Sequence, residues 1–268
     1  MYPVLFHLGG FALHTYGMVA ALAFIAAGYV VHRLLKLRGL PGELAFELVF
    51  VAAFGGLGGA RLYWLVQHWG LVSHDLMHFA LSGAGFTWYG GLAGGFVAVA
   101  AWSLYRRIPL GVSANVMAPA VALGYAVGRV ACQLAGDGNY GRPSSLPWAM
   151  AYPHGMVPTT VRVQPTPVYE TLIMLVVFWA LYRMARKTQP GWYVFAWFLV
   201  LSGLERLGIE FLRLNPPWLL GLTAPQWIAI AGIGAGAVLI VALRRRPVPS
   251  AALIGESRRQ YSGGEVVS

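Results

Sequence analysis

The chain has 268 residues, of which 58% are hydrophobic and only 10% are charged. Soluble domains average about 25% charged residues, so this composition excludes an ordinary water-soluble globule and favours a protein embedded in a bilayer. The net charge of +10 does not indicate a nucleic-acid partner, because most Lys and Arg residues form short clusters directly after apolar runs, where such clusters set membrane topology.

Seven apolar stretches follow one another along the chain. A helix needs roughly 20 residues to cross a hydrocarbon core of about 30 Å, and each stretch is that long or nearly so. They lie at residues 12–32, 44–66, 87–105, 114–135, 166–185, 191–212 and 224–243. We therefore expect an all-α integral membrane protein with seven transmembrane helices.

The segments between these stretches alternate in charge. Clusters of Lys and Arg follow the first, third, fifth and seventh stretches: Arg33, Lys36 and Arg38; Arg106 and Arg107; Arg183, Arg186 and Lys187; Arg244, Arg245 and Arg246. Loops 67–78 and 214–223, which follow the second and sixth stretches, contain no Lys or Arg. The positive-inside rule predicts an external N-terminus and a cytoplasmic C-terminus.

Two further segments complete the predicted organisation. Residues 136–164, between helices four and five, are rich in Pro and polar residues and are expected to form a small external cap of turns and short strands. Residues 1–246 would then be one seven-helix membrane domain. Residues 247–268 are polar and contain Gly and Ser, which predicts a disordered cytoplasmic tail.

Ionisable residues inside the apolar stretches are the most informative positions. They are Arg61, Arg129, Glu170, Glu205, Arg206, Glu210 and Arg213. Such groups are costly in lipid, so they usually face the bundle interior and mark a site. A charge near a helix end, such as Arg213, is equally well explained as an anchor that reaches toward the interface.

Arg206, Glu210 and Arg213 are spaced i, i+4 and i+7, which places them on one face of the sixth predicted helix. This stripe either neutralises itself or leaves a guanidinium group free to bind an anion, because Arg offers phosphate a planar fork of donors. The residues thus predict a net-positive interior suited to an anionic amphiphile such as a phospholipid. Cys132 fits a small core residue better than a reactive thiol, and no metal or cofactor motif is present.

Six short motifs resemble those of the bacterial prolipoprotein diacylglyceryl transferase family, over about residues 7–243. Residues 13–17 read LHTYG, where the family has LHWYG, and residues 59–63 read GARLY, as in GARLYY. Residues 88–91 read WYGG against FHGG, and residues 128–142 read GRVACQLAGDGNYGR against GRLGNFINGE followed by WGR. Residues 165–170 read PTPVYE against PSQLYE, and residues 205–213 read ERLGIEFLR against FRIIVEFFR.

The resemblance implies a transferase of the bacterial cytoplasmic (inner) membrane that needs no cofactor. It would move the diacylglyceryl group of phosphatidylglycerol to the lipobox cysteine thiol in the signal peptide of a lipoprotein precursor, releasing glycerol phosphate. By motif, Arg129 and Arg206 would hold the phosphate, and Glu210 would orient Arg206 or handle a proton. The implied substrate-binding residues are His14, Tyr16, Arg61, Cys132, Asp137, Asn139, Gly141, Glu170 and Arg213.

Two departures from the family pattern leave other functions open. The histidine of the family's HGG motif, a proposed general base, is Tyr89 here, and Cys132 replaces the asparagine of GRLGN. Tyrosine is a poor base near neutral pH, although a thiol activated directly by arginines needs less help. One alternative is a paralogue that transfers a lipid moiety to another acceptor. The other is a non-catalytic lipid-binding protein with the same fold.

Overall fold

The computed structural model describes residues 4–8, 11–73, 75, 77, 79 and 87–244, and helices occupy all seven predicted stretches. The elements are β1 (Val4–Leu8), β2 (Phe11–His14), α1 (Thr15–Leu37), α2 (Leu44–Gln67), α3 (Trp69–Val72), α5 (Trp88–Tyr105), α6 (Leu110–Ala135), β3 (Met150–Tyr152), β4 (Thr159–Val163), α7 (Thr166–Ala185), α8 (Tyr193–Glu210) and α9 (Ala224–Arg244). The predicted tail, 247–268, lies outside the described residues.

Five of the described helices are long and apolar enough to cross a membrane: α1, α2, α6, α7 and α9. The apolar part of α5, Gly90–Tyr105, is shorter, and the 18 residues of α8 include Glu205, Arg206 and Glu210. On α2, Phe46, Phe50 and Phe54 form an exposed stripe. A contiguous apolar surface of this kind is unfavourable in water and suited to lipid. The protein is therefore a multi-pass membrane protein.

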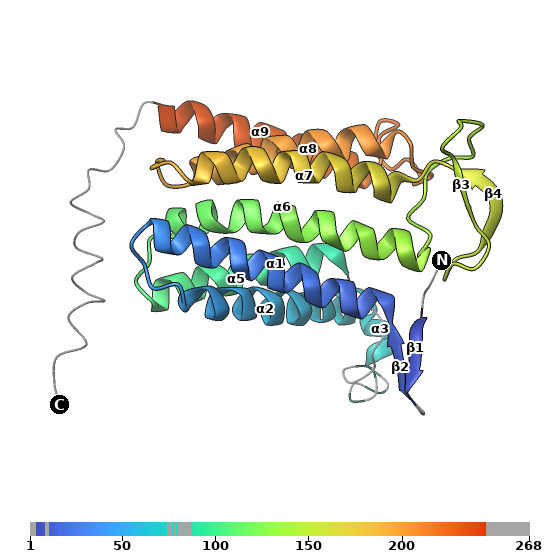
Figure 1. Ribbon diagram of the computed structural model, residues 1–268, viewed down its shortest axis with the longest axis horizontal. Helices are drawn as coiled ribbons and strands as arrows, with labels where there is room; N and C mark the ends of the chain where they lie inside the picture. The colour runs from blue at the N-terminus through green and yellow to red at the C-terminus, as the bar shows by residue number, and fades with distance from the viewer. Residues whose placement is uncertain are drawn as a thin grey trace.

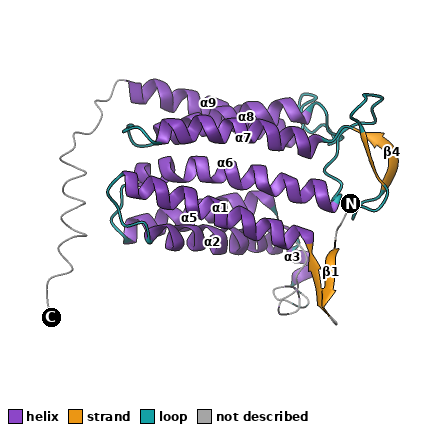
Figure 2. Cartoon of the chain, in the orientation of Figure 1, coloured by secondary structure: helices purple, strands orange, loops and turns teal. Residues whose placement is uncertain are grey.

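The long helices run side by side, and α6 lies between two groups (Figures 1 and 2). On one side of α6 are α1, α2 and α5; on the other are α7, α8 and α9. The most extensive contacts join α2 to α5, α8 to α9, α1 to α6 and α6 to α7. Helix α6 is thus the element through which the two groups meet.

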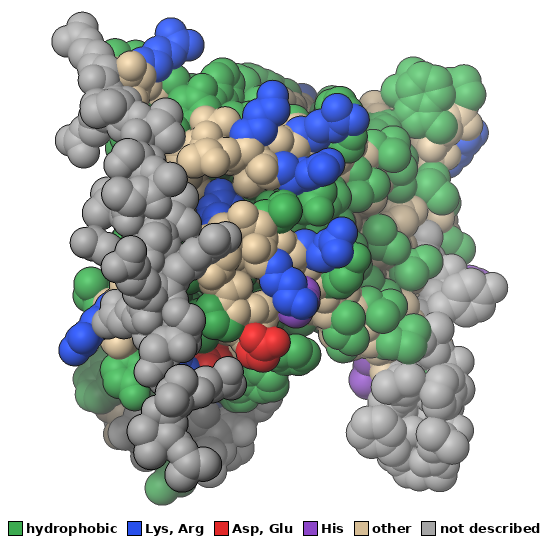
Figure 3. Space-filling view, turned by 60° about the vertical axis from the view of Figure 1, so that its left-hand side comes forward, with side chains coloured by type: hydrophobic (Ala, Val, Ile, Leu, Met, Phe, Trp, Pro, Cys, Tyr) green, Lys and Arg blue, Asp and Glu red, His purple; other side chains and the backbone are tan. Residues whose placement is uncertain are grey.

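The two ends of this bundle differ in character. Buried apolar side chains concentrate toward the end where α1 and α7 finish, and Val31, Leu34, Leu48 and Leu181 are essentially inaccessible there. Lys and Arg side chains gather on the outer face of that end (Figure 3). Both strand pairs lie at the opposite end (Figure 1). The buried charged residues Glu170, Glu205 and Glu210 belong to the half of the bundle nearer the strands.

Helices α2 and α5 approach closely through glycines. A Cβ atom added to Gly59 would lie 2.6 Å from the Gly94 Cα, and one added to Gly94 would lie 2.7 Å from the Gly59 Cα. Gly58, one position earlier, has no atom within 4 Å of such a Cβ. Small residues at a helix crossing allow this backbone contact in a membrane, so the glycine-rich stretch before Arg61 serves α2–α5 packing.

The structure differs from the predicted elements mainly at the N-terminus. The first stretch was expected to be helical from residue 12, but α1 begins at Thr15 after an antiparallel β1–β2 hairpin. His14 has an extended backbone, with φ −78° and ψ 132°. It therefore precedes α1, although it lies within the predicted helical stretch 12–32. Between α6 and α7, the antiparallel pair β3–β4 confirms the prediction of short strands within 136–164.

Candidate functional site

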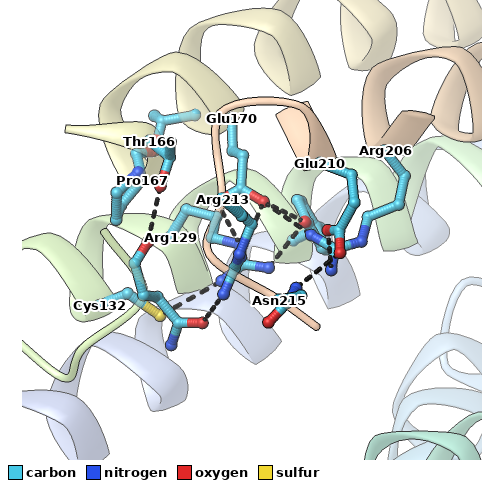
Figure 4. A network of polar contacts seen from close by, with 12 residues as sticks. Arg129, Cys132, Thr166, Pro167, Glu170, Arg206, Glu210, Arg213 and Asn215 are labelled. Atoms are coloured by element: carbon cyan, nitrogen blue, oxygen red, sulfur yellow. Dashed lines mark hydrogen bonds and ion pairs between the residues drawn. The ribbon is translucent and has the colours of Figure 1, made fainter. Parts of the chain in front are cut away.

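Glu170, in the first turns of α7, is the centre of a buried ionic network (Figure 4). Its side chain is completely buried, and its Oε2 lies 3.1 Å from Nε of Arg129 on α6. Its Oε1 lies 3.6 Å from Nη1 of Arg206 on α8 and 3.7 Å from Nη1 of Arg213. The Tyr125 hydroxyl also donates to Oε1, at 3.0 Å. One carboxylate therefore holds three guanidinium groups together.

Glu210 is a second buried anchor of this network. Its Oε2 pairs with Nη2 of Arg206 at 2.8 Å, which confirms that these residues, spaced i and i+4, share a helix face. Its Oε1 accepts hydrogen bonds from Asn215 Nδ2 at 2.6 Å and from the Thr223 hydroxyl at 2.8 Å. Arg206 is thus held between Glu170 and Glu210, and the segment leading to α9 is fastened to the same carboxylate.

Arg129 connects the network to Cys132. Its Nη2 donates to the Tyr125 hydroxyl at 2.8 Å, and its guanidinium lies over the Tyr125 ring, 4.8 Å from the centroid. Its Nη1 lies 3.8 Å from the Cys132 sulfur. The side chains of Arg129, Arg206 and Arg213 remain 16%, 25% and 11% exposed, so each keeps part of its surface for a ligand. A cluster of partly exposed guanidinium groups in an apolar bundle is suited to an anion.

The loop after α6 closes one side of the network. Asn139 accepts a hydrogen bond from Arg213 through its side-chain oxygen, and its backbone oxygen accepts one from the Thr166 hydroxyl at 2.6 Å. The Gly141 amide donates to the Gln164 carbonyl at 2.9 Å. A Cβ atom at Gly141 would lie 2.6 Å from the Leu212 carbonyl oxygen, so only glycine allows the loop to approach the end of α8 this closely.

The same loop is tied to the β3–β4 pair. Tyr140 stacks on Tyr152 with ring centroids 4.1 Å apart, and its hydroxyl donates to the Gly136 carbonyl at 2.7 Å. Gly136 ends α6 with φ +64°, a left-handed conformation that glycine adopts without strain. Asp137 accepts hydrogen bonds from the backbone and side chain of Asn139 at 3.1 and 2.8 Å. These contacts fix the loop beside Arg129 and Arg213.

The structure brings together most of the residues singled out in the sequence. Five of them interact directly: Arg129, Glu170, Arg206, Glu210 and Arg213. Two expectations need correction. Arg213 does not lie on the sixth helix, because α8 ends at Glu210 and Arg213 follows in a turn. It is also no interfacial anchor, since its guanidinium turns inward to Glu170. Glu170 of α7 pairs with both Arg206 and Arg213, and Glu210 pairs with Arg206.

The remaining predicted residues are less closely joined to the network. Tyr16, in the first turn of α1, is half exposed and interacts electrostatically with Cys132, Asp137 and Arg129. His14 is exposed at the end of β2. Arg61 is buried on α2, with its guanidinium 5.0 Å from the Trp64 ring centroid. Tyr89 is the second residue of α5, and its side chain lies outside the described part of the structure.

Three residues of the network were not anticipated: Tyr125, Asn215 and Thr223. The sequence does contain a signal for Tyr125, because it precedes Arg129 by four residues and so shares its helix face. Asn215 and Thr223 lie in a loop and before α9, and nothing local connects them to Glu210. Among the described residues, no three His, Cys, Asp or Glu side chains converge as a metal site.

Comparisons with known proteins agree with the motif resemblance. A family model described as prolipoprotein diacylglyceryl transferase matches residues 3–242. A protein of Bordetella avium is 34% identical over 258 residues, covering 91% of this chain and 95% of its own length. Proteins of Geobacter sulfurreducens and Clostridium tetani are 32% and 30% identical and cover 83% and 81% of this chain. All three are named phosphatidylglycerol–prolipoprotein diacylglyceryl transferase.

Proposed function

The chain belongs to the prolipoprotein diacylglyceryl transferase family, and we propose that it transfers the diacylglyceryl group of phosphatidylglycerol to the lipobox cysteine of lipoprotein precursors. The observation that carries this proposal is the network in which Glu170 and Glu210 hold Arg129, Arg206 and Arg213 in one buried cluster. A passive structural element has little use for five ionisable groups at this depth.

The proposed chemistry is displacement of a phosphate ester. The acceptor sulfur forms a bond to the terminal diacylglyceryl carbon, and the bond from that carbon to the ester oxygen breaks. Glycerol phosphate leaves with the electron pair, so negative charge on the phosphate increases during the reaction. Preorganised guanidinium donors stabilise such a transition state more than the ground state. We assign the phosphate to Arg129 and Arg206, because both are partly exposed and rigidly held by carboxylates.

The other proposed roles follow from position. Arg213 and Asn139 would fix the loop 136–142 against the bound headgroup, and Gly141 would permit the close approach of that loop. Tyr16 and Asp137, which lie near enough for the Asp137 carboxylate to act electrostatically on the Tyr16 hydroxyl, would line the route of the acceptor peptide. Cys132 and Arg61 would shape the lipid-binding interior. The signal peptide of the precursor would enter beside residues 136–164.

Complementation tests the function directly. Wild-type protein should restore growth and lipoprotein processing to a bacterium depleted of its own transferase. A Tyr89→His variant is tested in parallel, because the family motif has histidine at that position. Rescue by the variant alone would indicate a paralogue with another acceptor or weakened activity. Absence of rescue by both, with both proteins present in the membrane, would contradict the proposed reaction and favour a non-catalytic lipid-binding protein.

We further propose seven transmembrane helices in a bacterial cytoplasmic membrane, with the N-terminus and the network end outside. Helices α5 and α8 would complete the set of seven, because Arg206 and Glu210 of α8 point into the network rather than toward lipid. Lys36, Arg183 and Arg244 lie in the last turns of α1, α7 and α9, and several Lys and Arg side chains gather at that end of the bundle (Figure 3). The positive-inside rule assigns it to the cytoplasm.

Cysteine labelling tests this orientation. Ser145 and Lys187 are exposed positions at opposite ends of the bundle, and the native Cys132 is buried. A membrane-impermeant maleimide added to intact cells should label Ser145→Cys. It should label Lys187→Cys only after the membrane is permeabilised. The reverse pattern would overturn the proposed topology, and wild-type protein carrying only Cys132 measures the background.

A further inference from the structure

Glu205 is a buried carboxyl group that the network does not use. It lies on α8 directly before Arg206, at a position where the family motif FRIIVEFFR has phenylalanine. Its side chain is 7% exposed, and its Oε1 has no hydrogen-bond partner among the described residues. It also forms no ion pair within 4 Å there, although its charge interacts with Glu170, Arg129 and Arg206.

An unpartnered carboxyl at this depth is unfavourable in either protonation state. The ionised form leaves Oε1 without a donor, and a proton on Oε1 would have no acceptor among the described residues. Apolar side chains would fill the same space at no such cost. A substrate group that arrives with a proton to donate would satisfy the oxygen, and an ionisable residue retained inside a membrane helix is a functional candidate for this reason.

The other carboxylates near the network are already committed to donors. Glu170 forms ion pairs with three arginines and accepts a hydrogen bond from Tyr125. Glu210 forms an ion pair with Arg206 and accepts hydrogen bonds from Asn215 and Thr223. Asp137 accepts two hydrogen bonds from Asn139. Among the described residues of this group, Glu205 is therefore the carboxylate with a buried oxygen that has neither an arginine within 4 Å nor a hydrogen-bond donor.

We propose that Glu205 accepts the proton of the acceptor thiol and acts as general base in a chain where Tyr89 replaces the histidine of the family motif. The proposal rests on the transferase function proposed above. The S–H bond breaks and its proton moves to Glu205 while sulfur bonds to the diacylglyceryl carbon. The ester C–O bond breaks, its electron pair leaves with glycerol phosphate, and protonated Glu205 then returns its proton to water.

A hydroxyl of the phosphatidylglycerol headgroup is the competing partner for the same oxygen. The two cases differ in what they require of residue 205. A hydroxyl is satisfied by any acceptor, including the carbonyl oxygen of glutamine, whereas accepting the thiol proton requires a carboxylate. Glu205→Gln keeps the size and the acceptor and removes only the base, so it separates the two cases.

The test uses the full-length protein in phosphatidylglycerol vesicles with a lipobox peptide as acceptor. We expect Glu205→Gln to lower kcat/KM for the peptide by about 100-fold near pH 7, which is typical for loss of a general base. The remaining rate should rise with pH as more of the peptide thiol ionises, up to about 10-fold per unit, and the KM for phosphatidylglycerol should stay unchanged. Glu205→Asp, which keeps the carboxylate, should retain more activity than Glu205→Gln. Glu47→Gln is the matched control, because Glu47 pairs with Arg106 on the other half of the bundle.

Each outcome has a separate meaning. A wild-type rate and pH profile in Glu205→Gln would overturn the role of Glu205 while leaving the transferase function intact. Wild-type kinetics in Glu205→Gln, together with a raised KM for phosphatidylglycerol in Glu205→Ala, would assign Glu205 to the headgroup and overturn the proposal. Restored activity in the double variant Glu205→Gln/Tyr89→His would support it independently of folding effects. Wild-type protein without transfer, beside an active relative, would contradict the transferase function itself.

Discussion

Replacing Arg206 by alanine is expected to lower diacylglyceryl transfer by about 100- to 1,000-fold, as for loss of a donor to a developing anion. Arg206 is held by Glu170 at 3.6 Å and by Glu210 at 2.8 Å, so its donors are oriented before substrate binds. Because the charge on the phosphate grows as glycerol phosphate leaves, the loss should appear in kcat as well as in kcat/KM. Initial rates in phosphatidylglycerol vesicles measure both.

Two further variants give this prediction its controls. Arg206→Lys keeps the charge and loses the planar fork, so it should retain more activity than alanine does. Arg183→Ala removes an arginine that stacks on Trp179 near the basic end of α7, and it should transfer at the wild-type rate. Unchanged turnover in Arg206→Ala, together with the same result in Arg129→Ala, would remove the phosphate site from this network.

Contacts between residues close in the sequence could be predicted from the sequence, whereas contacts that depend on the packing of separate helices could not. Arg206 and Glu210 are four residues apart, and the periodicity of a helix alone placed them on one face. The bounds of α7 match the predicted apolar stretch 166–185, and Pro167 stands in the first turn, where a helix tolerates proline. The pairing of Glu170 with all three arginines depends on how α6, α7 and α8 pack, which no local pattern contains.

The N-terminal differences have a similar origin. Ala12 and Leu13 are apolar, and an apolar run that continues into a helix cannot be divided by hydropathy alone. The β1–β2 hairpin is instead defined by the pairing of Leu8 with Phe11 and of Val4 with His14. Asn215 and Thr223 were not predicted to join the network. Their common partner, Glu210, is 5 and 13 residues away, and these spacings do not mark one face of a helix.

Glu170→Gln is expected to cause the second large effect, on stability as well as on activity. The substitution keeps the shape of a completely buried side chain and removes the charge that faces three guanidinium groups. Breaking a buried ion pair by neutralising one partner typically costs about 3–5 kcal/mol. The thermal unfolding midpoint of the detergent-solubilised protein should fall, and transfer should decrease because Arg129 loses its carboxylate partner at 3.1 Å.

Glu47→Gln supplies the comparison, since Glu47 pairs with Arg106 and is 39% exposed. Exposed pairs contribute about 1 kcal/mol or less, so this variant should unfold close to the wild-type temperature. The double variant Glu170→Gln/Arg129→Gln should be less destabilised than the two single variants added together, because it removes a charge from each side of the pair. Additive losses would mean that Glu170 and Arg129 are not coupled, and that Arg129 is positioned by other contacts.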